Sequence, residues 1–245
     1  PGAEAKAIAE SLLSGERKAV LLGNAAAQHP QAGALLALAN WIAAQTGASV
    51  GYLTEAANTV GAQLAQAQPG AGGLNAGQML GKGGLKAALL LDVEPTLDAA
   101  DPSAAKAALE QAETVIAFSA FKTAALDVAD VLLPVSPFTE TSGTFVNAEG
   151  RAQSFVGVVK PLGETRPAWK VLRVLGNMLS LPGFDFETSE DVRAEALGDL
   201  TALAARLDNA SNAAIAAPAA PAGLQRIADV PIYSADSLVR RADAL

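Results

Sequence analysis

The chain has 245 residues, of which 51% are apolar and only 4% aromatic, and its formal net charge is −8. That length and apolar content allow a sizeable buried core built mainly from small side chains. The acidic balance disfavours binding to nucleic acid or to an anionic membrane surface. The absence of cysteine excludes thiolate-held iron–sulfur clusters, and a single histidine excludes a multi-histidine metal site.

Short apolar runs alternate with longer helical patterns through the first 180 residues. The runs are continuously apolar, which is typical of strands buried on both faces of a parallel sheet, and their alternation with helices indicates βαβ units. We therefore predict an α/β fold: a Rossmann-like, mostly parallel sheet of about five strands with helices on both faces. A β-hairpin follows the last strand, and a helical and extended appendage ends the chain. The predicted strands are 18–23, 49–53, 86–92, 114–119 and 131–135, and the predicted helices are 3–13, 28–45, 59–66, 76–80, 101–111, 123–127 and 167–179.

Composition predicts four parts, and no apolar run reaches the roughly 20 residues that span a bilayer. They are an α/β domain over 1–185, a helical extension over 186–208, an Ala/Pro-rich linker over 209–223 and a tail over 224–245. We expect the linker to be mobile in isolation. We expect Arg240 and Arg241 of the tail to dock on an acidic surface only in an assembled complex. The chain begins with Pro1 and no initiator methionine, which suggests a piece of a longer polypeptide.

Two strand ends carry polar side chains where an open α/β sheet binds its ligands. Asp92 and Glu94 follow the strand 86–92, and they could bind Mg²⁺ or remain solvated or helix-capping. Asn24 and His29 lie in the turn after the first strand, which lacks both a G-x-G-x-x-G pattern and a phosphate-binding lysine. We expect this to be an ordinary strand-to-helix turn, with His29 on the surface or capping a helix.

The most informative stretch is 127–155. It contains Ala-Asp-Val-Leu-Leu-Pro and then Glu140-Thr-Ser-Gly-Thr-Phe-Val-Asn147-Ala-Glu149-Gly-Arg151-Ala-Gln. Asn147 and the glycine at 150 suit a tight reversal of the chain, and the Arg151 side chain can lie beside Glu149 or Glu140. This pattern resembles a signature of the molybdopterin oxidoreductase superfamily.

The tail Pro-Ile-Tyr-Ser-Ala-Asp-Ser-Leu-Val-Arg-Arg-Ala resembles the C-terminal end of one branch of that superfamily. That branch is the large iron–sulfur subunit of bacterial respiratory NADH–quinone oxidoreductase, complex I. The resemblance covers roughly residues 15–180 and the tail. It implies a scaffold fragment of an oxidoreductase that moves electrons from NADH to quinone, with iron–sulfur clusters in the missing N-terminal part.

The resemblance also carries expectations for cofactors, partners and location. Partners would be other domains and subunits of the complex I peripheral arm, at the cytoplasmic face of the inner membrane, with no membrane insertion of this chain. No catalytic residue, metal ligand or bound cofactor is expected here. In cofactor-binding relatives the segment at Asp92 and Glu94 typically reads G-x-N-P, so two carboxylates replace Gly and Asn and would repel a pyrophosphate.

The alternative is a molybdopterin guanine dinucleotide-binding domain of an active molybdenum oxidoreductase such as a formate dehydrogenase or nitrate reductase relative. The vestigial or alternative contact residues are Asn24, Asp92, Glu94, Glu140, Asn147, Glu149 and Arg151.

Overall fold

The computed structural model describes residues 2–54, 56–215, 223 and 232–244. The described residues fall into two compact units: unit 1 lies within 1–61, 146–152 and 200–229, and unit 2 lies within 62–145, 153–199 and 230–245. The helices of eight residues or more are α1 (Ala3–Ser14), α3 (Ala32–Thr46), α7 (Pro102–Glu110), α8 (Ala168–Met178) and α9 (Ser189–Leu197). The shorter helices are α2 (Asn24–Ala27), α4 (Thr59–Leu64), α5 (Ala76–Lys82), α6 (Pro95–Asp98), α10 (Ile232–Ala235), η1 (Ala124–Leu126), η2 (Phe138–Glu140), η3 (Leu200–Arg206) and η4 (Val239–Arg241).

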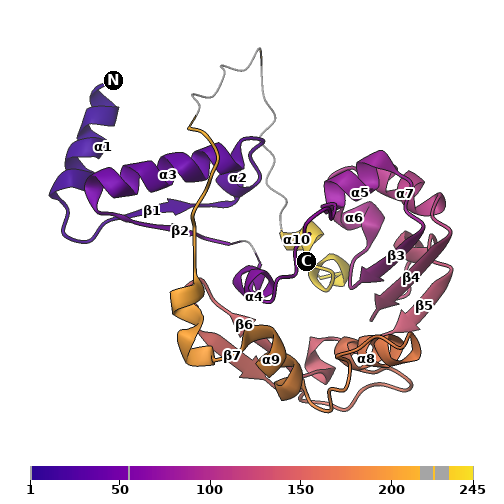
Figure 1. Ribbon diagram of the computed structural model, residues 1–245. Helices are drawn as coiled ribbons and strands as arrows, with labels where there is room; N and C mark the ends of the chain where they lie inside the picture. The colour runs from indigo at the N-terminus through magenta and orange to yellow at the C-terminus, as the bar shows by residue number, and fades with distance from the viewer. Residues whose placement is uncertain (1, 55, 216–222, 224–231, 245) are drawn as a thin grey trace. The chain divides into compact units, whose positions relative to one another are not determined.

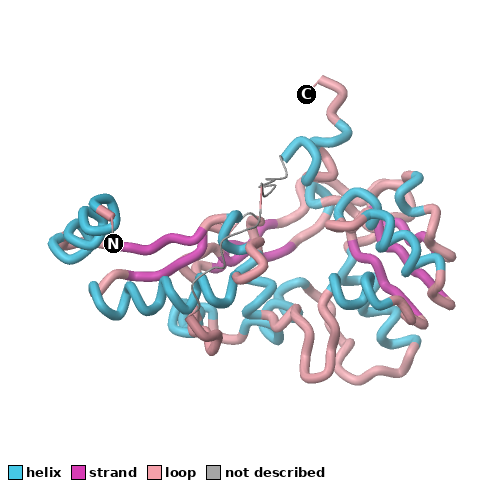
Figure 2. Tube along the Cα trace, turned by 90° about the horizontal axis from the view of Figure 1, so that it is seen from above, coloured by secondary structure: helices cyan, strands magenta, loops and turns pink. Residues whose placement is uncertain are grey.

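Unit 1 is built on a two-stranded parallel sheet covered by one long helix. Strand β1 (Ala19–Leu22) pairs with β2 (Ser49–Tyr52), and α3 lies alongside both strands (Figures 1 and 2). The helix is rich in alanine and leucine and ends at Gly47, whose φ of +73° is the left-handed conformation that terminates helices. This is a short βαβ unit with the connection that a parallel pair requires.

Unit 2 contains a three-stranded parallel sheet in the order β3–β4–β5. Its strands are β3 (Ala87–Leu91), β4 (Thr114–Ser119) and β5 (Val131–Pro134). The central strand β4 supplies most of the core, since Val115, Ala117 and Phe118 each retain only 1% exposure. Helices α5 and α6 pack against α7, as Figure 1 shows beside the sheet. All three strands end at one edge, so the residues that follow β3 and β4 share a carboxyl edge.

A hairpin follows the sheet. Strand β6 (Gly143–Val146) pairs with β7 (Ala152–Phe155), and the rings of Phe145 and Phe155 meet edge to face with centroids 5.1 Å apart. A side chain at Gly143 would meet the Phe155 ring at 2.7 Å, so glycine allows this close approach. The hairpin predicted after the last strand is confirmed.

The α/β class is confirmed, with parallel sheets flanked by helices. All five predicted parallel strands are present, but they form sheets of two and three strands instead of one sheet of five. The predicted four-part division stays a prediction, and most of its linker and the first part of its tail fall at 216–222 and 224–231, outside the described residues. Within the part of the chain that is described, no helix has the length and apolar character to cross a bilayer.

Candidate functional site

The carboxyl edge of β3 and β4 gathers the most closely coupled charges in unit 2. Asp92 follows β3 directly, and its backbone N–H donates to the carbonyl of Phe118, 2.9 Å away, so pairing with β4 continues past the strand end. Asp92 adopts a φ of +49°, a left-handed conformation that favours glycine. Partial burial raises the pKa of the Asp92 carboxyl, and a hydrogen bond from the Ala120 backbone partly offsets that rise.

Glu94 is the centre of this edge and is only 4% exposed. It precedes Pro95, which opens the short helix α6, and its backbone N–H donates to Asp98 Oδ2 at 2.6 Å. Its Oε1 accepts from the Thr123 hydroxyl at 2.6 Å and from Arg241 Nη2 at 2.5 Å. Burial alone would raise the pKa of Glu94, but these two hydrogen bonds and the charges of both tail arginines outweigh burial and lower it.

The tail arginines therefore do contact an acidic surface, but that surface belongs to this chain. Arg240 Nη2 lies 2.5 Å from Asp98 Oδ1, and Arg240 Nη1 lies 3.5 Å from Glu94 Oε2. The expectation that docking needs an assembled complex is wrong. The tail carries its charges to a site that the sequence places 147 residues away from Arg241.

The signature turn between β6 and β7 uses its polar groups internally. Asn147 Oδ1 accepts the backbone N–H groups of Glu149, at 3.1 Å, and Arg151, at 2.9 Å. Gly150 is buried with a φ of +80°, and a side chain there would meet the Ala204 backbone at 2.8 Å. Among the ion pairs of the described residues, none joins Arg151 to Glu149 or to Glu140, the two carboxylates beside which its side chain could lie. Arg151 is exposed, and the turn is shaped by Asn147 instead.

The other sequence candidates belong to other elements. Asn24 is the first residue of α2, in unit 1. The neighbouring His29 accepts the Gln31 backbone N–H on Nδ1 at 3.0 Å, in the turn just before α3. Glu140 ends η2, and its Oε2 accepts the Leu162 N–H at 3.0 Å, so it ties down the loop after β7.

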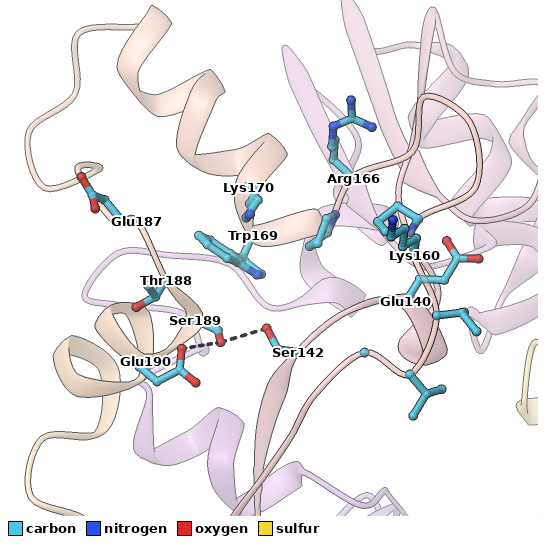
Figure 3. Close-up of a pocket in the computed structure, with 15 residues that line it drawn as sticks. Glu140, Ser142, Lys160, Arg166, Trp169, Lys170, Glu187, Thr188, Ser189 and Glu190 are labelled. Carbon is cyan, nitrogen blue, oxygen red and sulfur yellow. Dashed lines mark hydrogen bonds between the residues drawn. The ribbon is translucent and has the colours of Figure 1, made fainter.

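Glu140 also lines a cavity of about 600 Å³ in unit 2, which the sequence did not predict (Figure 3). Figure 3 shows Ser142 and Ser189 pointing toward each other, 2.9 Å apart, and Ser189 donating to Glu190 at 3.0 Å. The lining includes three cationic side chains, Lys160, Arg166 and Lys170, and three carboxylates, Glu140, Glu187 and Glu190. The lining contains no histidine and no cysteine, and the Ser189 hydroxyl in it is bonded to Glu190, the next residue along the chain.

The N-terminus of α9, beside this cavity, is already capped. Thr188 Oγ1 accepts the Asp191 N–H at 3.1 Å, and Asp191 Oδ2 accepts the Thr188 N–H at 2.8 Å. Hydrogen bonds to its carboxylate, from Thr188 first and then from the Glu187 backbone, lower the pKa of Asp191. Because this reciprocal capping box uses the free donors of the helix, an anion gains little there.

Metal binding at the sheet edge is disfavoured by the same arginines. Across the described ranges no three His, Cys, Asp or Glu side chains lie close enough together to hold a metal ion. Two guanidinium groups contact Glu94, so a divalent cation there would have to displace them. The sequence did not identify the residues that surround the tail arginines. Asp98, Phe121 and Thr123 have no distinguishing pattern beyond their positions near strand ends.

Comparison with known proteins places the chain in a family. The profile of the molybdopterin oxidoreductase family matches residues 3–178, so the chain belongs to that family. Similar proteins include one named "Putative formate dehydrogenase" from Staphylococcus aureus (strain bovine RF122 / ET3-1), 41% identical over 81 residues. A second, from strain MRSA252, is 40% identical over 75 residues. These matches cover 33% and 31% of this chain and 8% of each relative, so the chain spans a small part of the relatives it matches.

Proposed function

We propose that this member of the molybdopterin oxidoreductase family is a supporting domain of an oxidoreductase whose redox centres lie in other parts of the protein. The observation that carries the proposal is the pair of carboxylates, Asp92 and Glu94, at the carboxyl end of β3. Open parallel sheets bind ligands at this edge. A pyrophosphate there would face the like charge of Asp92, and the Glu94 carboxylate beside it is already occupied by two arginines of the tail. Unit charges 4 Å apart interact by about 4 kcal/mol at an effective dielectric of 20.

The finer proposal is that the complete protein is the large iron–sulfur subunit of an NADH–quinone oxidoreductase. It is supported by the resemblance of the tail and by the absence of cysteine from this chain, which leaves cluster ligation to other segments. In that setting the chain would contact other domains and subunits of the peripheral arm at the cytoplasmic side of the membrane. Its contribution to electron transfer from NADH to quinone would be structural.

The second candidate is a molybdopterin guanine dinucleotide-binding domain of an active molybdenum enzyme. The names of the similar proteins favour it, because those relatives are named as formate dehydrogenases. It would need nucleotide contacts near Asn24, Glu94 and Asn147. The geometry of unit 2 disfavours it, because Glu94 is already bound to two arginines.

Calorimetric titration with GDP separates the two candidates. We expect no binding to the wild-type chain at millimolar GDP. The double substitution Asp92→Gly and Glu94→Asn, which restores the G-x-N-P pattern of cofactor-binding relatives, should allow measurable binding if carboxylate repulsion is the obstacle. GDP binding by the wild-type chain as tight as that of the double variant would refute the supporting role.

Metal analysis of the complete protein, isolated with its upstream sequence, tests the finer assignment. Iron without molybdenum or tungsten is the expected result. Stoichiometric molybdenum or tungsten would favour the formate dehydrogenase-like candidate instead.

A further inference from the structure

The C-terminal segment contacts the carboxyl edge of β3 and β4 through two adjacent arginines. Figure 1 shows the backbone of α10 beside α6. Arg241 Nη2 contacts Glu94 Oε1, and its guanidinium carbon lies 4.1 Å from the centre of the Phe121 ring. Arg240 contacts Asp98 and approaches the second oxygen of Glu94. Each guanidinium therefore meets a carboxylate, and one of them also meets an aromatic face, which is the chemistry that selects arginine over lysine.

The surface that receives these arginines is held in shape without them. Thr123 donates to Glu94, and the Glu94 N–H donates to Asp98, so the two carboxylates are fixed by the elements that follow β3 and β4. Glu94 is almost fully buried, and an isolated buried carboxylate is costly unless it is paired. This fixed arrangement of carboxylates is therefore stable only when cationic groups are paired with it.

The tail segment is likewise shaped by its own contacts. Asp236 Oδ1 accepts the N–H groups of Leu238 and Val239, both at 2.9 Å, and fixes the turn before the arginines. Arg241 Nη1 donates to the Ser237 carbonyl at 2.6 Å. These bonds present both guanidinium groups from one short turn.

Apolar packing contributes little to the hold on the tail. Tyr233 is 59% exposed and Leu238 is 42% exposed, and none of the tail side chains that are described is buried. The contact therefore depends mainly on charge, and salt screens it most at Arg241, whose side chain is 25% exposed, and less at the almost fully buried Glu94. A segment held in this way can leave its site without unfolding the sheet beneath it.

We propose that Glu94, Asp98 and Phe121 form a binding site for a peptide turn carrying two adjacent arginines, and that this chain's own tail occupies it as a releasable latch. The proposal is independent of the supporting role argued above, because it concerns only the contacts between the tail and unit 2. Release of the tail exposes a site with the same specificity for a di-arginine segment supplied in trans.

The test uses a fluorescein-labelled peptide of residues 232–245 and fluorescence anisotropy on three full-length chains. The wild type should bind the peptide weakly, because its own tail competes. The Arg240→Ala/Arg241→Ala variant should bind at least about tenfold more tightly, since a site that is free less than a tenth of the time loses that factor in apparent affinity. Adding Glu94→Ala to that variant should abolish binding, and a control peptide with lysine at both arginine positions should bind more weakly.

Equal peptide affinity for the wild type and the double variant would overturn the proposal, as would binding that ignores the Glu94 substitution. Circular dichroism of each variant checks that the fold is intact. If the variants do not fold, hydrogen exchange of the wild type decides the matter. Raising salt from 0.05 M to 1 M should release protection at residues 233–244 while β3, β4 and β5 stay protected, and protection of the tail that is unchanged by salt would also refute the latch.

Discussion

Glu94→Gln isolates the charge at the centre of the carboxyl edge. Glutamine keeps the size of the side chain and can still accept the Thr123 hydrogen bond, so packing changes little. The charge is lost, and Arg240 and Arg241 then face a neutral group. Their side chains retain 11% and 25% exposure, against 5% for Glu94.

The expected loss in the free energy of unfolding follows from that burial. Removing one partner of a buried ion pair costs about 3–5 kcal/mol because the other charge is left uncompensated. The arginines keep some contact with water, and Arg240 keeps Asp98, so we expect about 2–3 kcal/mol, at or below the lower end of that range. The matched control is Glu110→Gln, which breaks the Lys106–Glu110 pair, whose side chains are 58% and 55% exposed. That pair should contribute no more than about 0.5 kcal/mol.

Urea unfolding followed by circular dichroism measures both changes. A double-mutant cycle of Glu94→Gln with Arg241→Ala should give a coupling of at least about 1 kcal/mol, because the two side chains are in direct contact. The reasoning fails if Glu94→Gln costs no more than Glu110→Gln. It also fails if the Glu94 and Arg241 substitutions are additive.

Three further predictions concern pH and two glycines. Hydrogen bonds and the charges of the tail arginines lower the pKa of Glu94 in the folded chain. The ionised Glu94 therefore stabilises the fold fully above the ordinary pKa of 4.5, and this contribution is lost as pH falls through the lower folded pKa. On acidification below pH 4.5 the urea midpoint of the wild type should fall more than that of Glu94→Gln. Burial raises the pKa of Asp92 in the folded chain, so the folded state is favoured when this carboxyl is protonated and loses that contribution as pH rises through the folded pKa. Asp92→Asn should therefore stabilise the chain at pH 7. In the same titration it should give no gain in stability below pH 3.8, the ordinary pKa of aspartate. Gly150→Ala should lower the free energy of unfolding by at least about 2 kcal/mol, because the position combines a positive φ with a clash against Ala204. The control Gly163→Ala has a φ of +56° and open space around it, and should cost about 1 kcal/mol. Equal thermal unfolding midpoints for the two variants would exclude the clash.

The strands could be predicted from the sequence because each is a continuous apolar run. Residues 114–119 form β4 with the bounds that the pattern indicated, and the other four strands differ by one or two residues at their ends. The pairing of the strands could not be predicted, because an apolar run does not specify its neighbour. The long segment from 53 to 86 separates β2 from β3, which belong to different sheets. The helix α6 was missed because four residues are too few to show the repeating i, i+3, i+4, i+7 pattern that identifies helices.

The candidate site was predictable only in part. Asp92 and Glu94 could be placed at a ligand-binding edge, because that edge follows from the strand that precedes them. The arginine pair was recognisable as a docking element, but the chain has 25 acidic residues, and nothing in the sequence chose Glu94 and Asp98 among them. Contacts between residues 147 apart arise from the fold and leave no local pattern.

Asp92 connects the backbone of this edge to its function. Its left-handed φ of +49° costs a non-glycine residue about 1 kcal/mol, and the resemblance places glycine at this position in relatives that bind the cofactor. The strain is tolerated because the Asp92 N–H bonds to Phe118 and continues the pairing of β3 with β4. The backbone geometry that open sheets use to bind ligands is thus present at this edge. The charge of the Asp92 side chain opposes a phosphorylated ligand, and Glu94 is neutralised by an arginine of the same chain. The proposed supporting role requires that geometry for the sheet itself and does not require a phosphate-compatible surface.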